Sequence, residues 1–314
     1  MNRREFVVAA TALAIAPEAL ARSLKGGPPS ALVTADLESH VAVVPLRGET
    51  PVAIVPTLRG PRSIERVGTA AVVAHTTQGA ISILRPGMAG VRAVVEGFEK
   101  PRYTASSSEG RFAFVTDSGS SELVVVDVMR AQVVARLKVG GPARHISVDR
   151  ERLWTALGTK ASRIAVVDVR DPLRPELLGR IRAPFLVHDV GFVPGSDLIW
   201  VTSGDRREVA LFNARTGRAV RRLRAGAPPQ HVAFTGRLAF VTSGDDGTLH
   251  THDARTGRRL RAARIPVGSY NVAEGLGFVF MPSLSQGTLC VADGHGRIRR
   301  SFRVARSSHD ACLA

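Results

Sequence analysis

Three stretches of the chain repeat one pattern: Phe114–Asp127 (FVTDSGSSELVVVD), Trp200–Asn213 (WVTSGDRREVALFN) and Phe240–Asp253 (FVTSGDDGTLHTHD). Each consists of an apolar strand, a polar turn that contains glycine, and a second strand that ends in Asp or Asn. The end of that second strand recurs every 40 to 45 residues, at Val44, Leu84, Asp127, Asp168, Asn213, Asp253 and Asp293. The chain therefore contains seven copies of one structural unit.

The residues around these stretches complete the unit. A tight turn follows the terminal Asp or Asn, as in Ala214–Arg218 and Ala254–Arg258, and its glycine permits the positive φ that such a turn needs. A further strand, a loop and another strand follow, and the last of these begins near His188 or His231. Four short strands and their turns need about forty residues, which is the size of one propeller blade. The sequence predicts an all-β, seven-bladed β-propeller with four-stranded antiparallel blades.

The two ends of the repeat array are complementary. The last six residues, His309–Ala314, match the start of a unit, and Ala31–Ala35 matches the second strand of a unit. We expect the C-terminal segment to supply the innermost strand of blade 1 and the N-terminal segment to supply the other three strands. Such closure pairs strand edges that would otherwise be exposed.

Residues 1–21 (MNRREFVVAATALAIAPEALA) are predicted to be an export signal. Arg3 and Arg4 precede an apolar run of about ten residues, and small residues at Ala19 and Ala21 suit cleavage. The run is too short to cross a bilayer. The Arg-Arg start is similar to a twin-arginine signal, and a general secretory signal is the alternative. Residues 22–314 are then a single propeller domain, expected to be monomeric, not transmembrane, and periplasmic or secreted.

Composition leaves two questions open. The net charge is +16 and arginine carries most of it. Arginines spread over solvent-facing turns would explain this charge without a function, whereas a cluster on one face would indicate binding to a polyanion. Cys290 and Cys312 fall in neighbouring units and are either a disulfide pair or free thiols.

The repeats also resemble a known family. Phe114–Asp117, Trp200–Ser203 and Phe240–Ser243 are similar to the Tyr-Val-Thr-Asn signature of the YVTN-repeat, lactonase-like propellers. The resemblance covers nearly all of residues 22–314 and implies the seven-bladed architecture. It implies little about activity, because members of the family include lactone hydrolases, surface proteins and periplasmic proteins.

Polar residues recur where the first strand of each unit begins. Aligned by that strand, five successive units place one residue each at an equivalent position: His145, His188, His231, Asn271 and His309. The remaining units place Glu65 and Arg102 or Tyr103 nearby, and turns on the same face hold Asp117, Asp205, Asp245 and Asp246. First strands line the central channel of a propeller, so we expect a ring of these side chains at its mouth, on the face called the top.

This ring has two interpretations. As a functional site, His145, His188, His231 and His309 would ligate a divalent metal, and the same histidines with Asn271 and Arg102 would contact a small or anionic ligand. As a structural feature, the imidazoles would only fix the start of each strand by hydrogen bonds. His250 and His252 lie on one face of a predicted strand and are a second, weaker metal candidate or an incidental pair.

No catalytic motif is present: we find no nucleophile elbow, Cys-x-x-Cys, His-Glu-x-x-His or phosphate loop. The leading hypothesis is an exported binding or accessory protein that holds a small ligand, a metal or a protein partner at the top of the channel. The alternative is a lactonase-like hydrolase or lyase that uses channel His and Arg residues or a bound metal. Polyanion binding through the basic surface is a third hypothesis.

Overall fold

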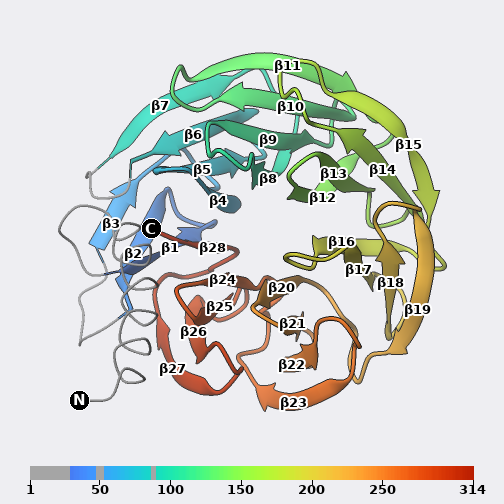
Figure 1. Ribbon diagram of the computed structural model, residues 1–314. Coiled ribbons are helices and arrows are strands. Elements are labelled where there is room, and N and C mark those ends of the chain that lie inside the picture. Colours follow the sequence, from blue (N-terminus) through green and yellow to red (C-terminus); the bar gives the residue numbers. More distant parts are fainter. Residues whose placement is uncertain (1–28, 47–52, 86–89) are drawn as a thin grey trace, which may run out of the picture.

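The computed structural model describes residues 29–46, 53–85 and 90–314, which form a ring of seven blades around a central channel (Figure 1). The predicted export signal, residues 1–21, lies outside the described residues. Each blade is a four-stranded antiparallel sheet. The first strand of each blade lies nearest the channel and the fourth forms the rim (Figure 1).

Blade 1 joins the two ends of the chain, as the sequence predicts. It has the order β28 (Ala311–Leu313), β1 (Ser30–Ala35), β2 (His40–Pro45), β3 (Ala53–Pro56). Leu32 pairs with Cys312, and the Thr34 amide donates a 2.9 Å hydrogen bond to the Asp310 carbonyl. The ring is therefore closed by hydrogen bonds between segments at opposite ends of the sequence.

The other six blades follow the chain in order. Blade 2 is β4 (Ser63–Val67), β5 (Ala70–His75), β6 (Ala80–Leu84), β7 (Val91–Glu96); blade 3 is β8 (Pro101–Ser106), β9 (Phe112–Asp117), β10 (Glu122–Asp127), β11 (Gln132–Lys138); blade 4 is β12 (Ala143–Asp149), β13 (Arg152–Leu157), β14 (Arg163–Asp168), β15 (Glu176–Arg182). Blade 5 is β16 (Val187–Phe192), β17 (Leu198–Ser203), β18 (Glu208–Asn213), β19 (Arg218–Arg224); blade 6 is β20 (Val232–Thr235), β21 (Leu238–Ser243), β22 (Thr248–Asp253), β23 (Arg259–Arg264); blade 7 is β24 (Ala273–Gly275), β25 (Phe278–Pro282), β26 (Thr288–Asp293), β27 (Ile298–Arg303).

The repeated residues hold neighbouring blades together. The aromatic residue of the second strand is fully buried between blades at Phe114, Trp154, Trp200 and Phe240. Trp200 of blade 5 also donates its indole N–H to the Ala254 carbonyl of blade 6 at 2.8 Å. The Thr two residues later bonds across the same boundary, because the Thr202 hydroxyl donates to the Gln230 carbonyl at 2.5 Å. These contacts explain why the Val-Thr pattern repeats.

The Asp or Asn that ends each repeated stretch lies at the end of the third strand of a blade, and it shapes the turn that follows. The Asn213 side-chain oxygen accepts hydrogen bonds from the Arg215 and Thr216 amides at 3.0 and 2.9 Å, and Asp253 does the same for its own turn. Such side-chain bonds to the backbone stabilise tight turns. Gly217 and Gly257 follow with φ of 66° and 74°, as the sequence predicts.

Cys290 and Cys312 are both buried and free. They belong to different core clusters, one beside Met281 and one beside Leu32. The disulfide alternative is therefore wrong. No helix of the described residues is both long and apolar enough to cross a membrane.

Candidate functional site

In blades 3, 4 and 5, a bulge at the start of the first strand places two residues at the channel mouth. In each of these blades, two consecutive residues oppose one residue of the second strand: Arg102 and Tyr103, Arg144 and His145, His188 and Asp189. Bulges of this kind redirect side chains and are common beside functional sites. Position 1 and position 2 below denote the first and second residue of this pair.

Strand register extends the two positions around the ring. Aligned by the second-strand residue that opposes the bulge, which is Thr202 in blade 5, position 1 holds Arg62, Arg102, Arg144, His188, Gln230, Tyr270 and His309, from blade 2 to blade 7 and then blade 1. Position 2 holds Ser63, Tyr103, His145, Asp189, His231, Asn271 and Asp310. The expected single row of His145, His188, His231, Asn271 and His309 is therefore two rows, offset by one residue.

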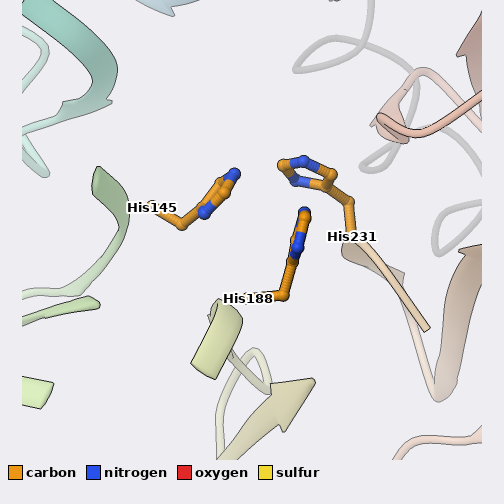
Figure 2. Close-up of side chains that lie close together, drawn as sticks. All are labelled: His145, His188 and His231. Carbon is orange, nitrogen blue, oxygen red and sulfur yellow. The ribbon is translucent and has the colours of Figure 1, made fainter. Parts of the chain in front are cut away.

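The offset brings three histidines together. His145 and His231 come from position 2 of blades 4 and 6, and His188 comes from position 1 of the blade between them. One ligand nitrogen from each ring lies within 4.8 Å of the others. Figure 2 shows the three rings directed into a common space. We call this group the histidine triad.

The triad separates two spaces. His188 lines an opening of about 350 Å³ on the top face, together with Asp205, Gln230 and Asp245. His145 and His231 instead line an inner cavity of about 200 Å³, with Tyr103 and Asp310. A ligand held by the triad would therefore sit where the top face leads into the channel.

The surroundings keep two of the three histidines, His145 and His188, neutral. Burial lowers the pKa of His145 well below 6.5, and the nearby His231, His188 and Arg144 lower it further. Burial, His231 and Arg144 lower the pKa of His188 in the same direction. Neutral imidazole has the lone pair that a metal requires.

The hydrogen bonding of the triad is incomplete. Both ring nitrogens of His145 are buried and have no hydrogen-bond partner among the residues that the structure describes. The ring packs instead against Tyr103, with the two centroids 4.0 Å apart and the ring planes tilted by 37°. His231 differs, because its Nδ1 lies 3.3 Å from the Asp189 carboxylate. A carboxylate at Nδ1 orients a ligating histidine and leaves Nε2 for a metal.

His309 and Asn271 are brought together but lie outside the triad. The His309 ring nitrogen Nδ1 bonds the Arg62 carbonyl at 2.8 Å, and the Asn271 amide donates to the His309 carbonyl at 2.7 Å. These bonds fix the start of the first strand, which is the structural role that the sequence offered as the alternative. Among the described residues, the group of three histidines that could hold a metal does not include His309.

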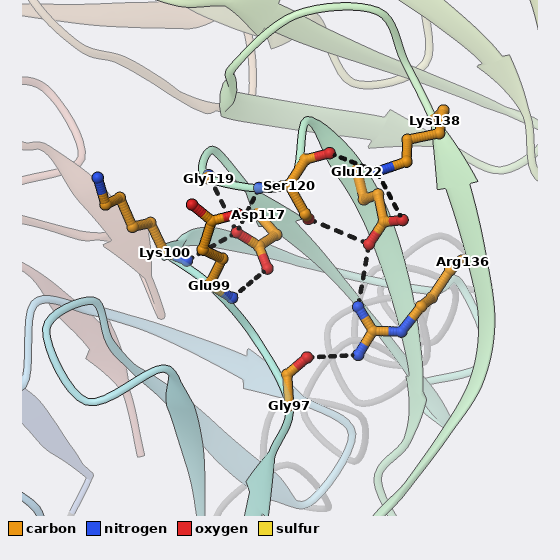
Figure 3. Close-up of polar contacts among 9 residues, drawn as sticks. All are labelled: Gly97, Glu99, Lys100, Asp117, Gly119, Ser120, Glu122, Arg136 and Lys138. Carbon is orange, nitrogen blue, oxygen red and sulfur yellow. Dashed lines mark hydrogen bonds and ion pairs between the residues drawn. The ribbon is translucent and has the colours of Figure 1, made fainter.

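The acidic turns of the top face have structural roles as well. The Asp117 carboxylate accepts hydrogen bonds from the Glu99 and Lys100 amides at 2.7 and 2.8 Å and from the Gly119 and Ser120 amides of its own turn (Figure 3). Asp245 accepts bonds from the Gln230 and Tyr270 side chains. These carboxylates order the loops around the channel mouth.

His250 and His252 do not form a comparable group. Their ring centroids are 6.2 Å apart, and His252 bonds the Gly257 carbonyl and packs 5.5 Å from Trp200. A shift of register between Thr251 and His252 interrupts the pairing of β22 with β23. Among the described residues, no third ligand joins this pair.

Two acids of the inner channel were not expected to interact. Burial raises the pKa of Glu65 to about 8, and the charges of Asp310 and Glu274 contribute. Burial also raises the pKa of Asp310 to about 7, against hydrogen bonds from the Ile64 and Ala311 amides. The sequence placed Glu65 near the ring, but only the closure of blade 1 against blade 2 brings Asp310 beside it.

Arg62 and Arg144 lie at the channel mouth but are not among the residues predicted from the sequence. Both occupy position 1, as Arg102 does, so three successive blades carry arginine at the channel mouth. A signal was present: Pro61-Arg62, Pro101-Arg102 and Pro142-Ala-Arg144 begin three successive units. An alignment based on the histidines alone did not reveal it.

No protein-family model matches the sequence, and no curated protein sequence matches it. Solved structures do match. A protein of unknown function from Desulfotomaculum acetoxidans has a TM-score of 0.76 at 10% identity, over 91% of this chain and 98% of that one. Apo AztD from Citrobacter koseri has a TM-score of 0.71 at 10% identity over the same shares, and hydrazine synthase from Kuenenia stuttgartiensis has 0.67 at 16% identity over 84% and 92%. At these identities the matches establish the propeller fold and nothing about the site.

Proposed function

We propose that this protein is an exported binding protein that holds a divalent transition metal at the top of its channel. The observation that carries the proposal is the histidine triad, in which three imidazoles converge and both nitrogens of the buried His145 lack a hydrogen-bond partner among the described residues. An unsatisfied buried polar group is costly, and a bound metal would satisfy one of these nitrogens. One fold can host many unrelated functions, so the propeller fold by itself does not support metal binding.

The donor set favours zinc or copper. Imidazole suits both ions, and no carboxylate or thiol belongs to the group of three. Nitrogens bound to one zinc ion lie about 3.4 Å apart, so rings now within 4.8 Å of one another would close slightly on the metal. Three protein ligands leave one position open for a water or another ligand.

The test measures zinc and copper binding by calorimetry and elemental analysis, on protein without a polyhistidine tag. We expect one ion per chain, and a loss of affinity on the order of a hundredfold or more in His145→Ala, His188→Ala and His231→Ala. His295→Ala removes an exposed histidine and is the matched control. His309→Ala should bind metal nearly as well as the wild type, because its ring bonds Arg62.

Thermal unfolding in chelator shows whether each variant folds. If folded His188→Ala/His231→Ala protein still binds one ion with the affinity of the wild type, the triad is not the metal site. If the wild type binds neither zinc nor copper, the proposal as a whole is wrong.

A lactonase-like hydrolase is the second candidate. A metal with three histidine ligands and an open position can activate water or polarise a carbonyl. Lactone hydrolysis by the metal-loaded wild type, lost in His188→Ala, would support it. Metal binding without hydrolysis of any lactone in the screen would favour the binding protein.

Export is part of the proposal and rests on residues 1–21. Mass spectrometry of the mature protein should show cleavage after Ala21. Replacing Arg3 and Arg4 with Lys should block export by the twin-arginine route and leave the general secretory route active. Retention of the full-length chain inside the cell in the wild type would contradict export.

A further inference from the structure

The channel mouth has a basic arc beside the histidine triad. Arg62, Arg102 and Arg144 occupy position 1 of blades 2, 3 and 4, and His188 occupies position 1 of blade 5. Equivalent positions in adjacent blades place these side chains next to one another around the channel. We call the three arginines the arginine arc.

The arc has few neutralising contacts. Arg62 has one long ion pair, 3.8 Å to Asp36. Arg102 donates to the neutral Ser118 hydroxyl at 3.1 Å. Arg144 Nε is buried and has no hydrogen-bond partner in the described part of the chain. Among the described residues, the three guanidinium groups therefore have one carboxylate partner between them, the Asp36 that pairs with Arg62.

The charges of the arc act on one another. Burial lowers the pKa of Arg102, and the charges of Arg144 and Arg62 lower it further. Like charges held together in a partly buried place are unfavourable unless an anion joins them. Guanidinium groups bind carboxylate and phosphate groups through paired hydrogen bonds, which makes arginine the preferred residue for such anions.

The arc and the triad are contiguous. Arg144 directly precedes His145 in the bulge of β12, and its charge lowers the pKa of both His145 and His188. A metal on the triad keeps an open coordination position. An anion on the arc is therefore placed to supply the remaining ligand.

We infer that the channel mouth binds a small oxyanion, a carboxylate or a phosphate, on Arg62, Arg102 and Arg144, and that this anion shares its site with the metal. The inference extends the proposed metal site, but the anion site can be measured without metal. It makes the natural ligand a metal–oxyanion pair instead of a bare ion. Coupling between the two must be reciprocal: zinc raises the affinity for the anion by the factor by which the anion raises the affinity for zinc.

The experiment titrates metal-free and zinc-loaded protein with succinate and, separately, with inorganic phosphate. We expect Arg102→Gln and Arg144→Gln to lower the affinity for the preferred anion by about tenfold, the usual effect of losing one charge-assisted contact. Arg224→Gln, which removes an exposed arginine of the rim, is the control and should bind like the wild type. The two anions distinguish a carboxylate site from a phosphate site.

The outcomes separate this inference from the metal proposal. Loss of anion binding in Arg102→Gln with zinc binding retained supports the arc. Equal anion binding in wild type, Arg102→Gln and Arg144→Gln overturns it, and so does an equal loss in Arg224→Gln. Anion affinity that zinc does not change shows separate sites and overturns the shared site. If the wild-type protein binds the anion but no zinc, the anion site on the arginine arc is supported and the metal proposal is wrong.

Discussion

At the scale of single residues, the recurring Thr of the second strand connects the repeat to the site. The Thr202 hydroxyl accepts the Asp189 amide at 3.0 Å and donates to the Gln230 carbonyl of the next blade. The Thr34 hydroxyl likewise accepts a hydrogen bond from the Asp310 amide and donates one to the Arg62 carbonyl. This Thr therefore fixes the bulge residues of one blade and the start of the next, so it positions the channel mouth without contacting a ligand.

Replacing this hydroxyl should destabilise the protein. Thr202→Val keeps the shape but leaves the buried Asp189 amide and Gln230 carbonyl unpaired, which costs about 1–3 kcal/mol. Urea unfolding measures the change. Thr216→Val, in an exposed turn, is the control, and an equal effect of the two changes would contradict this role.

The buried histidine His75 should make the stability of the protein depend on pH. It is fully buried, and its ring nitrogens lie 3.2 Å from the Arg59 carbonyl and 2.9 Å from the Ser82 hydroxyl. Burial lowers its pKa from 6.5 to about 4, so the folded protein keeps it neutral. The unfolded chain takes up a proton first as the pH falls, so this contribution to stability is complete above pH 6.5 and is lost on going down to pH 4.

His75→Gln should remove that contribution. The free energy of unfolding of the wild type should fall more steeply between pH 6.5 and 4 than that of the variant, by about 1.4 kcal/mol per pH unit. Chemical unfolding at several pH values measures both slopes. His295→Gln, at an exposed position, should keep the slope of the wild type, and a His75→Gln slope equal to the wild type would contradict the prediction.

Residue identities predicted the site only in part. The sequence selected His145, His188 and His231, because imidazoles recur at the start of the first strand. It could not show that His188 is offset from the other two, because a bulge depends on backbone pairing and leaves no mark in the side-chain pattern. His309 occupies position 1, as His188 does, but it belongs to blade 1 and its ring bonds the Arg62 carbonyl.

At the scale of elements, strands were predictable because apolar residues, turn glycines and the terminal Asp or Asn recur in fixed order. The turn between the third and fourth strands illustrates this. Gly257 has φ of 74°, and a Cβ added there would collide with the Leu223 side chain of the neighbouring blade. The glycine is therefore required by its φ and by contact between blades, and the sequence indicated only the first reason.

These two reasons can be separated by mutation. Gly236 also has a positive φ, 58°, but a Cβ there meets no atom within 4 Å. Gly236→Ala should cost about 1–2 kcal/mol from backbone strain alone, and Gly257→Ala should cost more because Leu223 must move. Thermal unfolding compares them. Equal melting temperatures would show that the contact with Leu223 is not important.

At the scale of the whole molecule, charge is distributed unevenly around the ring. The rim strands of blades 5, 6 and 7 (β19, β23 and β27) carry nine exposed arginines: Arg218, Arg221, Arg222, Arg224, Arg259, Arg261, Arg264, Arg299 and Arg303. Acidic partners neutralise two of them, Arg222 by Glu208 and Arg299 by Asp293. The sequence could not show this cluster, because its arginines are interspersed with other residues along the chain.

This basic rim should bind polyanions in a salt-dependent way. With heparin as the probe, the logarithm of affinity should fall with the logarithm of salt concentration, and the slope should become shallower in Arg221→Gln/Arg224→Gln/Arg261→Gln protein. Arg130→Gln/Arg163→Gln/Arg174→Gln removes the same charge from blades 3 and 4 and is the control. Equal slopes in both variants would attribute binding to net charge and not to the rim.

Ring closure also determines when the molecule can fold during synthesis. β1 and β2 are made early, yet the strand that completes their blade is β28, and Thr34 must meet Asp310 across 276 residues of sequence. Contacts so distant in sequence form late and slowly. The Asp310 carboxylate reaches the inner cavity through the same closure, so the channel acquires its final chemistry only after the ribosome has synthesised residue 310.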